Sequence, residues 1–329
     1  MLVVSIGCPA GIGPEVSVAA AARFREAPCV LVGDESTIYA AADLVGVSRG
    51  RFARFGGKAD DRGKIFVHAV GPELTKADRR PGKPSLRAGA AQLRWIDAAY
   101  DLASRAPARA LVTGPVSKAA IARSGAPGAK KFLGHTEWLC RRDSAKTSIM
   151  CFASEKLVTS LASTHLPLSR VPEVLSSARV RDATVALAQL LVGLGRRRPR
   201  IAVCSLNPHA GESELLGDEE RRAIVPGISA ARARLRKKAR IEGPIGAETA
   251  YRKALAATYD GVVAMYHDQA TIPLKLVAFG DAVNVTMGLS IVRTSVDHGT
   301  AYDIAWQGVA DGSGMSSAMK LAARLLEAN

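Results

Sequence analysis

Short apolar runs that end in glycine or polar turns recur along this chain, and segments with helical apolar spacing follow them. The runs cover residues 2–6, 29–32, 110–112, 201–206 and 261–265. A β-branched run that is too short for a helix and ends in such a turn is typical of a buried parallel strand. The chain is therefore predicted to be an α/β protein whose functional side chains lie at the carboxyl ends of its strands.

The composition is that of an ordinary globular protein. The chain has 329 residues, of which 48% are hydrophobic and 23% charged, which is enough for two α/β domains with full cores. No apolar run approaches the roughly 18 residues that a membrane span needs, so no membrane partner is expected. The N-terminal stretch lacks a basic flank and is interrupted by Gly and Pro, unlike a signal peptide. Five cysteines without a CxxC pair indicate reduced thiols and a cytoplasmic protein.

The net charge of +15 comes largely from arginine clusters within residues 49–54, 196–200 and 232–240. Nucleic-acid binding is one interpretation of such clusters, but aromatic residues make up only 5% of the chain and Phe52 alone lies within the arginine clusters. We therefore expect a basic surface without a nucleic-acid partner, which assists anionic substrates by steering.

Several strand-to-helix turns are rich in glycine. Residues 7–15 read GCPAGIGPE, but the dinucleotide fingerprint fails because Val16 occupies the position of its third glycine. The segment from Gly125 to Lys131 is predicted to be a linker and the first crossing between domains. A helix is expected to begin in residues 134–137 with Thr136 as its N-cap, where exposed N–H groups would suit a phosphate.

Three histidines follow strand-like runs: His165, His209 and His267. Three imidazoles from separate loops would hold a divalent metal ion and leave positions open for a substrate. The alternative is three histidines that serve packing or catalysis separately. No HxxxH or HExxH motif is present, so the spacing alone leaves both interpretations open.

A further group of donors suits an anion. It consists of His135, Thr136, Lys275, Asn284 and Arg293. Lys275 and Arg293 lie inside apolar runs, where an unpaired charge is costly, and this favours binding of a phosphate or carboxylate.

Eight motifs together carry a family resemblance. In chain order they read GCPAGIGPE, VTGPVSK, GHTE, THLPL, LNPHAGE, GPIGAET, MYHDQ and VRTSVDHGTAYDIA. In this combination they strongly resemble the 4-hydroxythreonine-4-phosphate dehydrogenase family of vitamin B6 biosynthesis. The match runs from Ile6 to about Asp311, nearly the whole chain.

The resemblance implies a fold and an activity. The fold is like that of isocitrate and isopropylmalate dehydrogenases, with two α/β/α domains and a cleft between them. We expect residues 1–128 plus 276–329 to form the first domain and residues 129–275 the second. The implied reaction is NAD- or NADP-dependent, divalent-metal-dependent oxidation of 4-phosphooxy-threonine at C3. The resulting β-keto acid decarboxylates to 3-amino-2-oxopropyl phosphate in pyridoxal phosphate biosynthesis.

The resemblance also assigns roles to residues. One divalent ion per site (Zn, Mg or Co) binds the three histidines named above, with His165 supplied by the partner of a homodimer whose sites are shared across the interface. The five anion donors contact the phosphorylated substrate. The candidate catalytic residues are Lys275, either as a base or as a substrate cation, His135 and Glu248. The nucleotide-contacting turn contributes Asp297, His298, Gly299, Thr300 and Asp303.

Four residues depart from the family pattern: Cys8 for Asp, Glu248 for Asp, Ser290 for Pro and Trp306 for Gly. The first two affect expected substrate specificity and Trp306 affects expected nucleotide affinity. Three alternatives remain open. One is a sibling dehydrogenase that acts on a phosphorylated threonate or erythronate, or on a carboxylated cis-dihydrodiol. The others are an acyl-phosphate transferase on a related fold and a non-catalytic basic binding protein.

Overall fold

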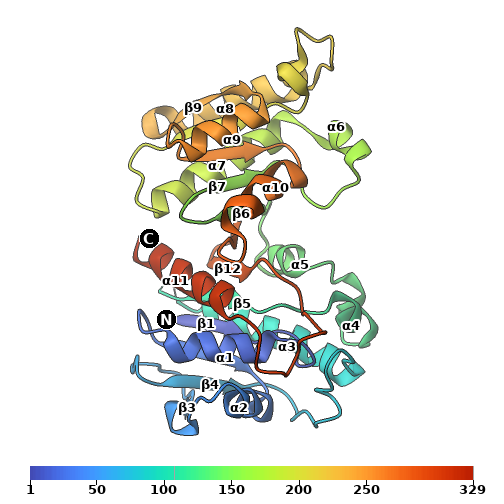
Figure 1. Cartoon of the computed structure of the whole chain (residues 1–329), viewed down its shortest axis with the longest axis vertical. Coiled ribbons are helices and arrows are strands. Elements are labelled where there is room, and N and C mark those ends of the chain that lie inside the picture. Colours follow the sequence, from blue (N-terminus) through green and yellow to red (C-terminus); the bar gives the residue numbers. More distant parts are fainter. Residues whose placement is uncertain (107, 329) are drawn as a thin grey trace. The chain divides into compact units, whose positions relative to one another are not determined.

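The computed structural model describes residues 1–106 and 108–328 and divides them into two compact units. Unit 1 consists of Met1–Lys146 and Leu289–Glu327, and unit 2 of Thr147–Gly288 (Figure 1). Both boundaries fall later in the chain than the expected 128 and 276. Helix α5 (His135–Arg142) stays with unit 1 because Trp138 Nε1 donates to Asp97 and Arg142 pairs with Asp101, both on helix α3 (Leu86–Ser104).

Unit 1 contains a parallel sheet in the order β3-β4-β2-β1-β5-β12. Its strands are β1 (Leu2–Ser5), β2 (Cys29–Gly33), β3 (Phe52–Arg54), β4 (Ile65–Ala69), β5 (Ala110–Thr113) and β12 (Val292–Val296). Connections run outward from β1 in both directions, so β1 and β5 form the topological switch point. Ligands of doubly wound folds bind outside the carboxyl ends of the strands at such a point.

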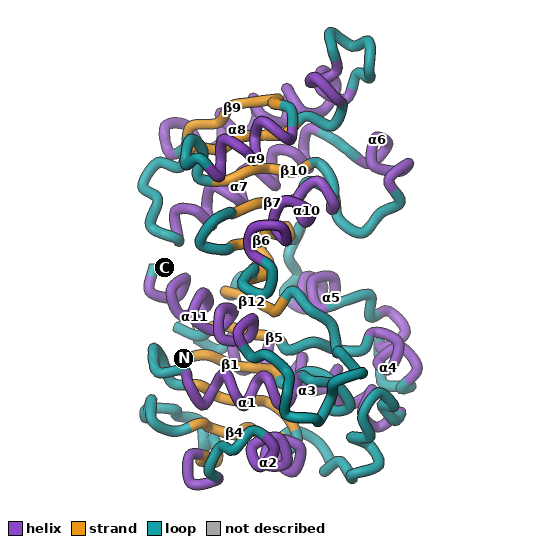
Figure 2. Tube along the Cα trace, in the orientation of Figure 1, coloured by secondary structure: helices purple, strands orange, loops and turns teal. Residues whose placement is uncertain are grey.

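The helices of unit 1 cover its sheet (Figure 2). They are α1 (Gly13–Arg23), α2 (Glu35–Leu44), α3 (Leu86–Ser104), α4 (Lys118–Arg123), α5 and α11 (Ser313–Glu327), with 3₁₀ turns η1 (Arg49–Arg51) and η2 (Ala129–Lys131). Helix α1 contacts both α2 and α11, whereas α3 packs against β1, β2 and β5. Polar side chains cap the first turns of two of these helices: Asp34, directly after β2, accepts from Thr37 N to cap α2, and Ser85 accepts from Ala88 N to cap α3.

Unit 2 contains a mixed sheet in the order β11-β6-β7-β10-β8-β9. Its strands are β6 (Ile149–Ala153), β7 (Val158–Leu161), β8 (Arg200–Cys204), β9 (Arg240–Ile245), β10 (Gly261–Ala264) and β11 (Val283–Met287). Strands β7, β10, β8 and β9 are parallel, and β6 pairs antiparallel with both β7 and β11. The carboxyl ends of β7, β10 and β8 are therefore neighbours.

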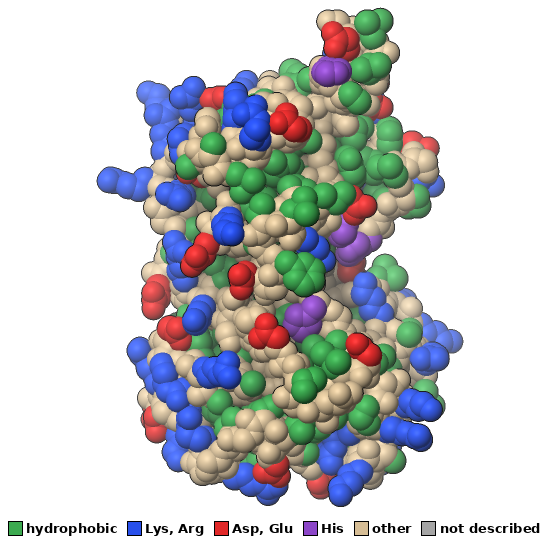
Figure 3. Space-filling model, in the orientation of Figure 1, with side chains coloured by type: hydrophobic (Ala, Val, Ile, Leu, Met, Phe, Trp, Pro, Cys, Tyr) green, Lys and Arg blue, Asp and Glu red, His purple; other side chains and the backbone are tan. Residues whose placement is uncertain are grey.

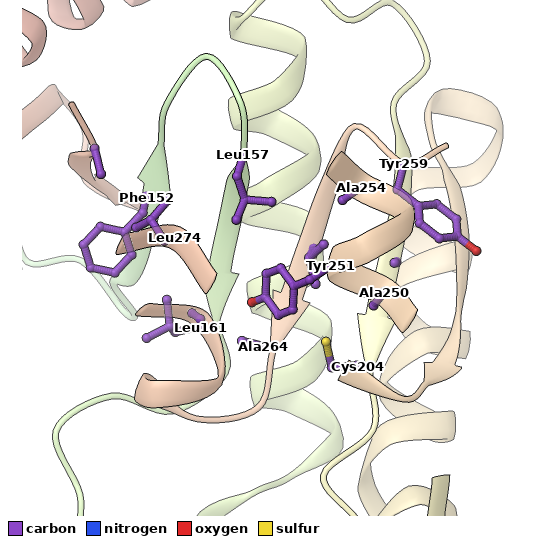
Figure 4. Packing of buried hydrophobic residues seen from close by; sticks show 14 of the residues in the cluster. Phe152, Leu157, Leu161, Cys204, Ala250, Tyr251, Ala254, Tyr259, Ala264 and Leu274 are labelled. Atoms are coloured by element: carbon purple, nitrogen blue, oxygen red, sulfur yellow. The ribbon is translucent and has the colours of Figure 1, made fainter. Parts of the chain in front are cut away.

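The helical segments of unit 2 lie on both faces of this sheet. They are α6 (Val171–Val174), α7 (Ser177–Gly193), α8 (Val225–Leu235), α9 (Ala247–Leu255) and α10 (His267–Ala278), with η3 (Leu168–Arg170), η4 (Pro208–Gly211), the π-helical η5 (Glu220–Ile224) and η6 (Arg236–Lys238). Helix α7 packs on α8, while α9 and α10 contact β8, β10 and β7. Tyr251 of α9 and Leu274 of α10 join Phe152, Leu161 and Cys204 in the buried core beneath α9 and α10 (Figure 4).

The predicted α/β class and the predicted strands are confirmed. The predicted N-cap is wrong: α5 begins at His135, so Gly134 is the N-cap and Thr136 lies within the first turn. Among the described residues, no helix combines the length and the apolar character that crossing a bilayer requires.

Candidate functional site

Unit 2 gathers polar residues where its central parallel strands end. His165 follows β7 and His267 follows β10, and because these strands are neighbours the two imidazole ring centroids lie 5.3 Å apart. The buried Gln269 side chain bonds to the backbone at this edge of the sheet. Its Oε1 accepts from Met265 N at 2.6 Å, and its Nε2 donates to Ser205 O at 2.8 Å. One buried amide thus joins the end of β10 to the end of β8.

The surroundings of His267 suit a metal ligand. Its Nδ1 lies 2.7 Å from Asp268 Oδ1. An imidazole whose Nδ1–H donates to a carboxylate presents the lone pair of Nε2, the arrangement that commonly orients histidine ligands of metal ions. His165 is exposed beside it. Two of the three expected ligands are therefore together and accessible in one chain.

His209 is placed differently. It lies in η4 with φ 50° and ψ 30°, exposed on a segment that projects from unit 2 between β8 and η5 (Figure 1). Within residues 1–106 and 108–328, no three His, Cys, Asp or Glu side chains are close enough to hold a metal ion. The chain itself pairs His165 with His267 and leaves His209 apart, whereas the resemblance singled out His165 as the ligand from the partner.

The other expected residues of unit 2 are less enclosed than the sequence indicated. Lys275 is exposed near the end of α10, so its predicted apolar surroundings are wrong. Glu248 is 76% exposed, and its pKa is lowered by the Thr249 hydroxyl and by Arg252, whose Nε lies 2.9 Å away. Asn284 is half-buried in β11, and its Oδ1 has no hydrogen-bond partner among the described residues.

Unit 1 contains a buried cation at the end of its sheet. Arg293 of β12 is only 2% exposed, and its Nη2 donates to Thr113 Oγ1 at 2.7 Å on the neighbouring β5. Burial lowers the pKa of Arg293 to about 10, opposed by the nearby Glu137. The guanidinium therefore remains charged near neutral pH, which makes it a site for an anion.

His135 adjoins this cation at the first residue of α5. Burial lowers its pKa well below 6.5, and the positive charges of Arg293 and Lys118 lower it further. The imidazole is therefore neutral at physiological pH. Its Nε2 is enclosed and has no hydrogen-bond partner in the part of the chain that the structure describes, and Phe132 packs edge-on against its ring. A neutral donor or acceptor beside a fixed cation is suited to a phosphate or carboxylate.

Two residues that lie with Arg293 and His135, Thr113 and Lys118, were not among the anion donors predicted from the sequence. Thr113 holds Arg293, and Lys118 supplies positive potential at His135. The usable signal was the strand-to-helix turn VTGPVSK, whose polar residues follow a completely buried strand. Thr136, which follows His135 in the sequence, is half-buried in the first turn of α5.

The expected nucleotide turn packs on the turn that connects β1 to α1. Ile12 N donates to Thr300 O at 3.0 Å, and a Cβ on Gly11 would come within 2.7 Å of the same oxygen. Glu15, buried in the first turn of α1, accepts from Trp306 N at 2.8 Å and Gly308 N at 3.1 Å. These bonds hold the segment after β12 beside the β1/β5 switch point.

The surface of this turn is open to a ligand. His298, Gly299 and Asp303 are exposed, while Asp297 and Thr300 are half-buried. A Cβ built on Gly299 would meet nothing within 4 Å, so the backbone there can be approached closely. An exposed turn with accessible peptide groups at a switch point fits a dinucleotide.

Three departures from the family pattern have local explanations. Trp306 adopts φ 61°, a backbone conformation that favours glycine, and its indole N–H donates to Pro9 O at 2.8 Å. The buried Cys8 has its Sγ 3.6 Å from the Tyr302 hydroxyl, and burial raises its thiol pKa. Ser290 donates through its backbone N to Asp143 at 2.7 Å, a bond that proline would lack.

Comparison with known proteins identifies the family. The profile described as "Pyridoxal phosphate biosynthetic protein PdxA" matches residues 25–322. The chain belongs to the PdxA family. It is 37% identical to the 4-hydroxythreonine-4-phosphate dehydrogenase of Geobacter metallireducens, with 98% of this chain and 95% of that protein covered. It is 38% identical to the D-threonate 4-phosphate dehydrogenase of Salmonella typhimurium, with 98% of each covered.

A solved PdxA-type structure agrees along the chain. The 4-hydroxythreonine-4-phosphate dehydrogenase of Klebsiella pneumoniae superposes with a TM-score of 0.84 at 36% identity, with 99% of each chain covered. Membership in this family of dehydrogenases makes the chain an oxidoreductase and confirms the resemblance drawn from its motifs.

Proposed function

We propose that this PdxA-family chain is an NAD- or NADP-dependent dehydrogenase that oxidises 4-phosphooxy-threonine at C3 in pyridoxal phosphate biosynthesis, in the cytoplasm. The product is a β-keto acid that loses CO2 to give 3-amino-2-oxopropyl phosphate. The observation that carries the proposal is the buried Arg293 beside the neutral His135, because a fixed cation with an enclosed donor suits a phosphorylated substrate. The names of the two relatives support a phosphorylated hydroxy acid.

Recognition of the phosphate falls to unit 1 in this proposal. Arg293 keeps its charge near neutral pH because its pKa is about 10, and the bond from its Nη2 to Thr113 Oγ1 fixes its orientation. His135 adds a hydrogen bond through its enclosed Nε2, and Thr136 adds the donors of the first turn of α5. Lys275 and Asn284 of unit 2 are the remaining proposed substrate contacts.

Metal binding falls to the histidines. One divalent ion per site (Zn, Mg or Co) would be held by His165 and His267 of one chain and by His209 of a second copy. The close pairing of His165 with His267 and the separate, exposed position of His209 support this division. When bound, such an ion polarises the substrate hydroxyl and then the carbonyl of the β-keto acid.

A homodimer would supply the second copy. Exposed apolar side chains that a partner would cover lie on the projecting segment, where Leu215 is 82% exposed, and at the end of α10. There Leu276 of the helix is 81% exposed and Phe279, directly after it, is 82% exposed. Isolated apolar side chains are normal on a surface, but groups of them often mark interfaces.

The oxidation needs a bound hydride acceptor, a proton acceptor and a substrate held in place. The turn from Asp297 to Asp303 would hold the dinucleotide, which takes the C3 hydride. The hydroxyl proton leaves to a base. Lys275 is exposed in this chain, so it would take that proton only where the bound substrate desolvates it, and it otherwise binds the anionic substrate. Neutral His135 keeps the phosphate in place. Glu248 stays ionised beside Arg252, so we propose a supporting role for it rather than that of an acid.

Production of NADH or NADPH from a substrate panel tests the proposal. The panel contains 4-phosphooxy-threonine, D-threonate 4-phosphate, a phosphorylated erythronate and a carboxylated cis-dihydrodiol. D-threonate 4-phosphate is the second candidate because a relative with 38% identity bears that name. We expect turnover of a phosphorylated member and loss of that turnover in Arg293→Ala. Turnover of the unphosphorylated dihydrodiol alone would refute the role of Arg293.

A further inference from the structure

The segment that carries His209 is closed at its base by one buried carboxylate. We call residues 208–219 the arm. Glu220, 7% exposed, accepts from Leu206 N and Asn207 N through Oε1, both at 2.9 Å. Its Oε2 accepts from Asn207 Nδ2 at 3.0 Å. Because Leu206 and Asn207 precede the arm and Glu220 follows it, these three bonds tie its two ends together.

Glycines let the chain pass through this base. Gly217 has φ 131°, and a Cβ there would lie 2.5 Å from Asn207 Nδ2. A Cβ on Gly211 would lie 3.0 Å from Glu220 Oε2. Leu216 N donates to Gly211 O at 3.1 Å, which closes the arm on itself. The contact around Glu220 is therefore too close to admit ordinary side chains.

The helix that holds Glu220 is itself anchored. Glu220 begins η5, whose Ala223 and Ile224 are buried and whose Arg222 donates to the backbone oxygens of Pro172 and Leu175. π-Helical turns are rare and occur often at functional sites. The carboxylate thus fastens an exposed arm to a fixed element.

Ion pairs of the arm's carboxylates Glu214, Asp218 and Glu219 with Arg221 and Arg222 of η5 also hold the arm. Non-glycine residues within it adopt left-handed backbone angles, among them His209 at φ 50° and Ala210 at φ 55°. L-residues rarely adopt these angles, and they persist where surrounding contacts impose them. The tip bears the exposed Leu215 and Leu216, and apolar side chains gather there in Figure 3.

We propose that Glu220 is the positioning residue for His209: its carboxylate, bonded to Leu206 and Asn207 at the base of the arm, fixes the orientation in which the imidazole meets a divalent ion. This inference rests on the proposed metal-binding role of His209. Groups that orient a metal ligand without touching the ion typically change metal affinity 10- to 100-fold when altered.

The test measures Zn²⁺ binding to the full-length protein by competition with a chromophoric chelator. Glu220→Gln keeps the side-chain shape but turns one acceptor into a donor that opposes Asn207 Nδ2. We expect it to weaken Zn²⁺ binding by about 10- to 100-fold. Asn207→Ala removes the side-chain bonds from Asn207 Nδ2 to Glu220 Oε2 and Glu219 Oε2 but keeps both backbone bonds to Glu220 Oε1. It decides the question if Glu220→Gln fails to fold. Glu214→Gln is the matched control, because Glu214 lies in the same arm but its side chain is half-exposed and pairs with the exposed Arg221.

A second readout needs no metal. Chymotrypsin cleavage after Leu215 or Leu216 in metal-free protein, followed by mass spectrometry, reports how firmly the arm is held. Cleavage should be at least about tenfold faster in Glu220→Gln and Asn207→Ala, with melting temperatures within a few degrees of wild type. A merely structural role of Glu220 would instead lower the melting temperature and leave Zn²⁺ affinity at the wild-type value.

His209→Ala separates the two claims. Weak Zn²⁺ binding in both His209→Ala and Glu220→Gln supports the inference. Weak binding in His209→Ala with wild-type binding in Glu220→Gln and Asn207→Ala overturns the role of Glu220 and leaves the metal site standing. Wild-type binding in His209→Ala overturns the metal site and the inference with it.

Discussion

Replacement of His135 should change how the stability of the protein depends on pH. Burial and two nearby cations hold the pKa of His135 well below 6.5 in the folded chain. Below pH 6.5 the unfolded chain therefore binds a proton that the folded chain does not, and the free energy of unfolding falls as pH falls. With an unfolded pKa of 6.5, this residue alone removes up to about 1.4 kcal/mol between pH 7.5 and 5.5.

Urea unfolding at pH 5.5, 6.5 and 7.5, in a chelator and without phosphate, measures this difference. His135→Asn should lose less stability than wild type over that interval, by up to about 1.4 kcal/mol, whatever its stability at pH 7.5. His298→Asn is the matched control, because that side chain is exposed in the same unit. Equal pH dependence in wild type and His135→Asn would refute the depressed pKa of His135.

Three further experiments test other parts of the molecule. Arg293→Ala should lower kcat/KM for the phosphorylated substrate by about 10- to 100-fold. Arg293→Lys should recover only part of this loss, because the point charge of an ammonium cannot reproduce the planar, two-pronged guanidinium. A mutant that loses NAD binding alone would contradict the assignment of Arg293 to the substrate. A mixture of His209→Ala and His267→Ala subunits should regain activity, because each heterodimer then has one intact site. A mixture of His165→Ala and His267→Ala subunits should stay inactive. Activity in the second mixture alone would show that His165, not His209, crosses the interface. Trp306→Gly should be more stable to urea than Trp306→Ala by about 1 kcal/mol, because both lose the indole but only alanine keeps a Cβ at φ 61°.

The fold followed from local patterns in the sequence. Buried strands such as β1, β5 and β10 are short β-branched runs that end in turns, so their position and parallel character could be predicted. The same patterns placed His165, His209 and His267 after strand-like runs but left open whether they meet. The pairing of His165 with His267 in one chain depends on β7 and β10 being neighbours, which the local pattern does not contain.

Other features depended on contacts that local patterns do not contain. An apolar run predicted burial for both Lys275 and Arg293, but Lys275 faces outward on a helix, whereas Arg293 lies in a strand beside β5. The position of His209 apart from the other two histidines depends on the left-handed backbone of the arm and on Glu220. Glu220 binds Leu206 and Asn207, which precede it by thirteen or more residues. Neither the backbone angles nor the pairing of Glu220 has a periodic signature.

The protonation states of Arg293 and His135 together determine how phosphate binding should depend on pH. Arg293 keeps its charge, since its pKa of about 10 lies far above neutrality, and His135 is already neutral at pH 7. A phosphate monoester gains its second negative charge near pH 6. Because neither of these two residues loses charge in that range, affinity should rise from pH 5.5 to 7.5 as the ligand becomes dianionic. An imidazole with an ordinary pKa would lose its charge over the same interval and offset the gain. Calorimetric titration of the phosphorylated substrate without dinucleotide measures this trend, and an affinity that falls across the interval would show that His135 binds as a cation.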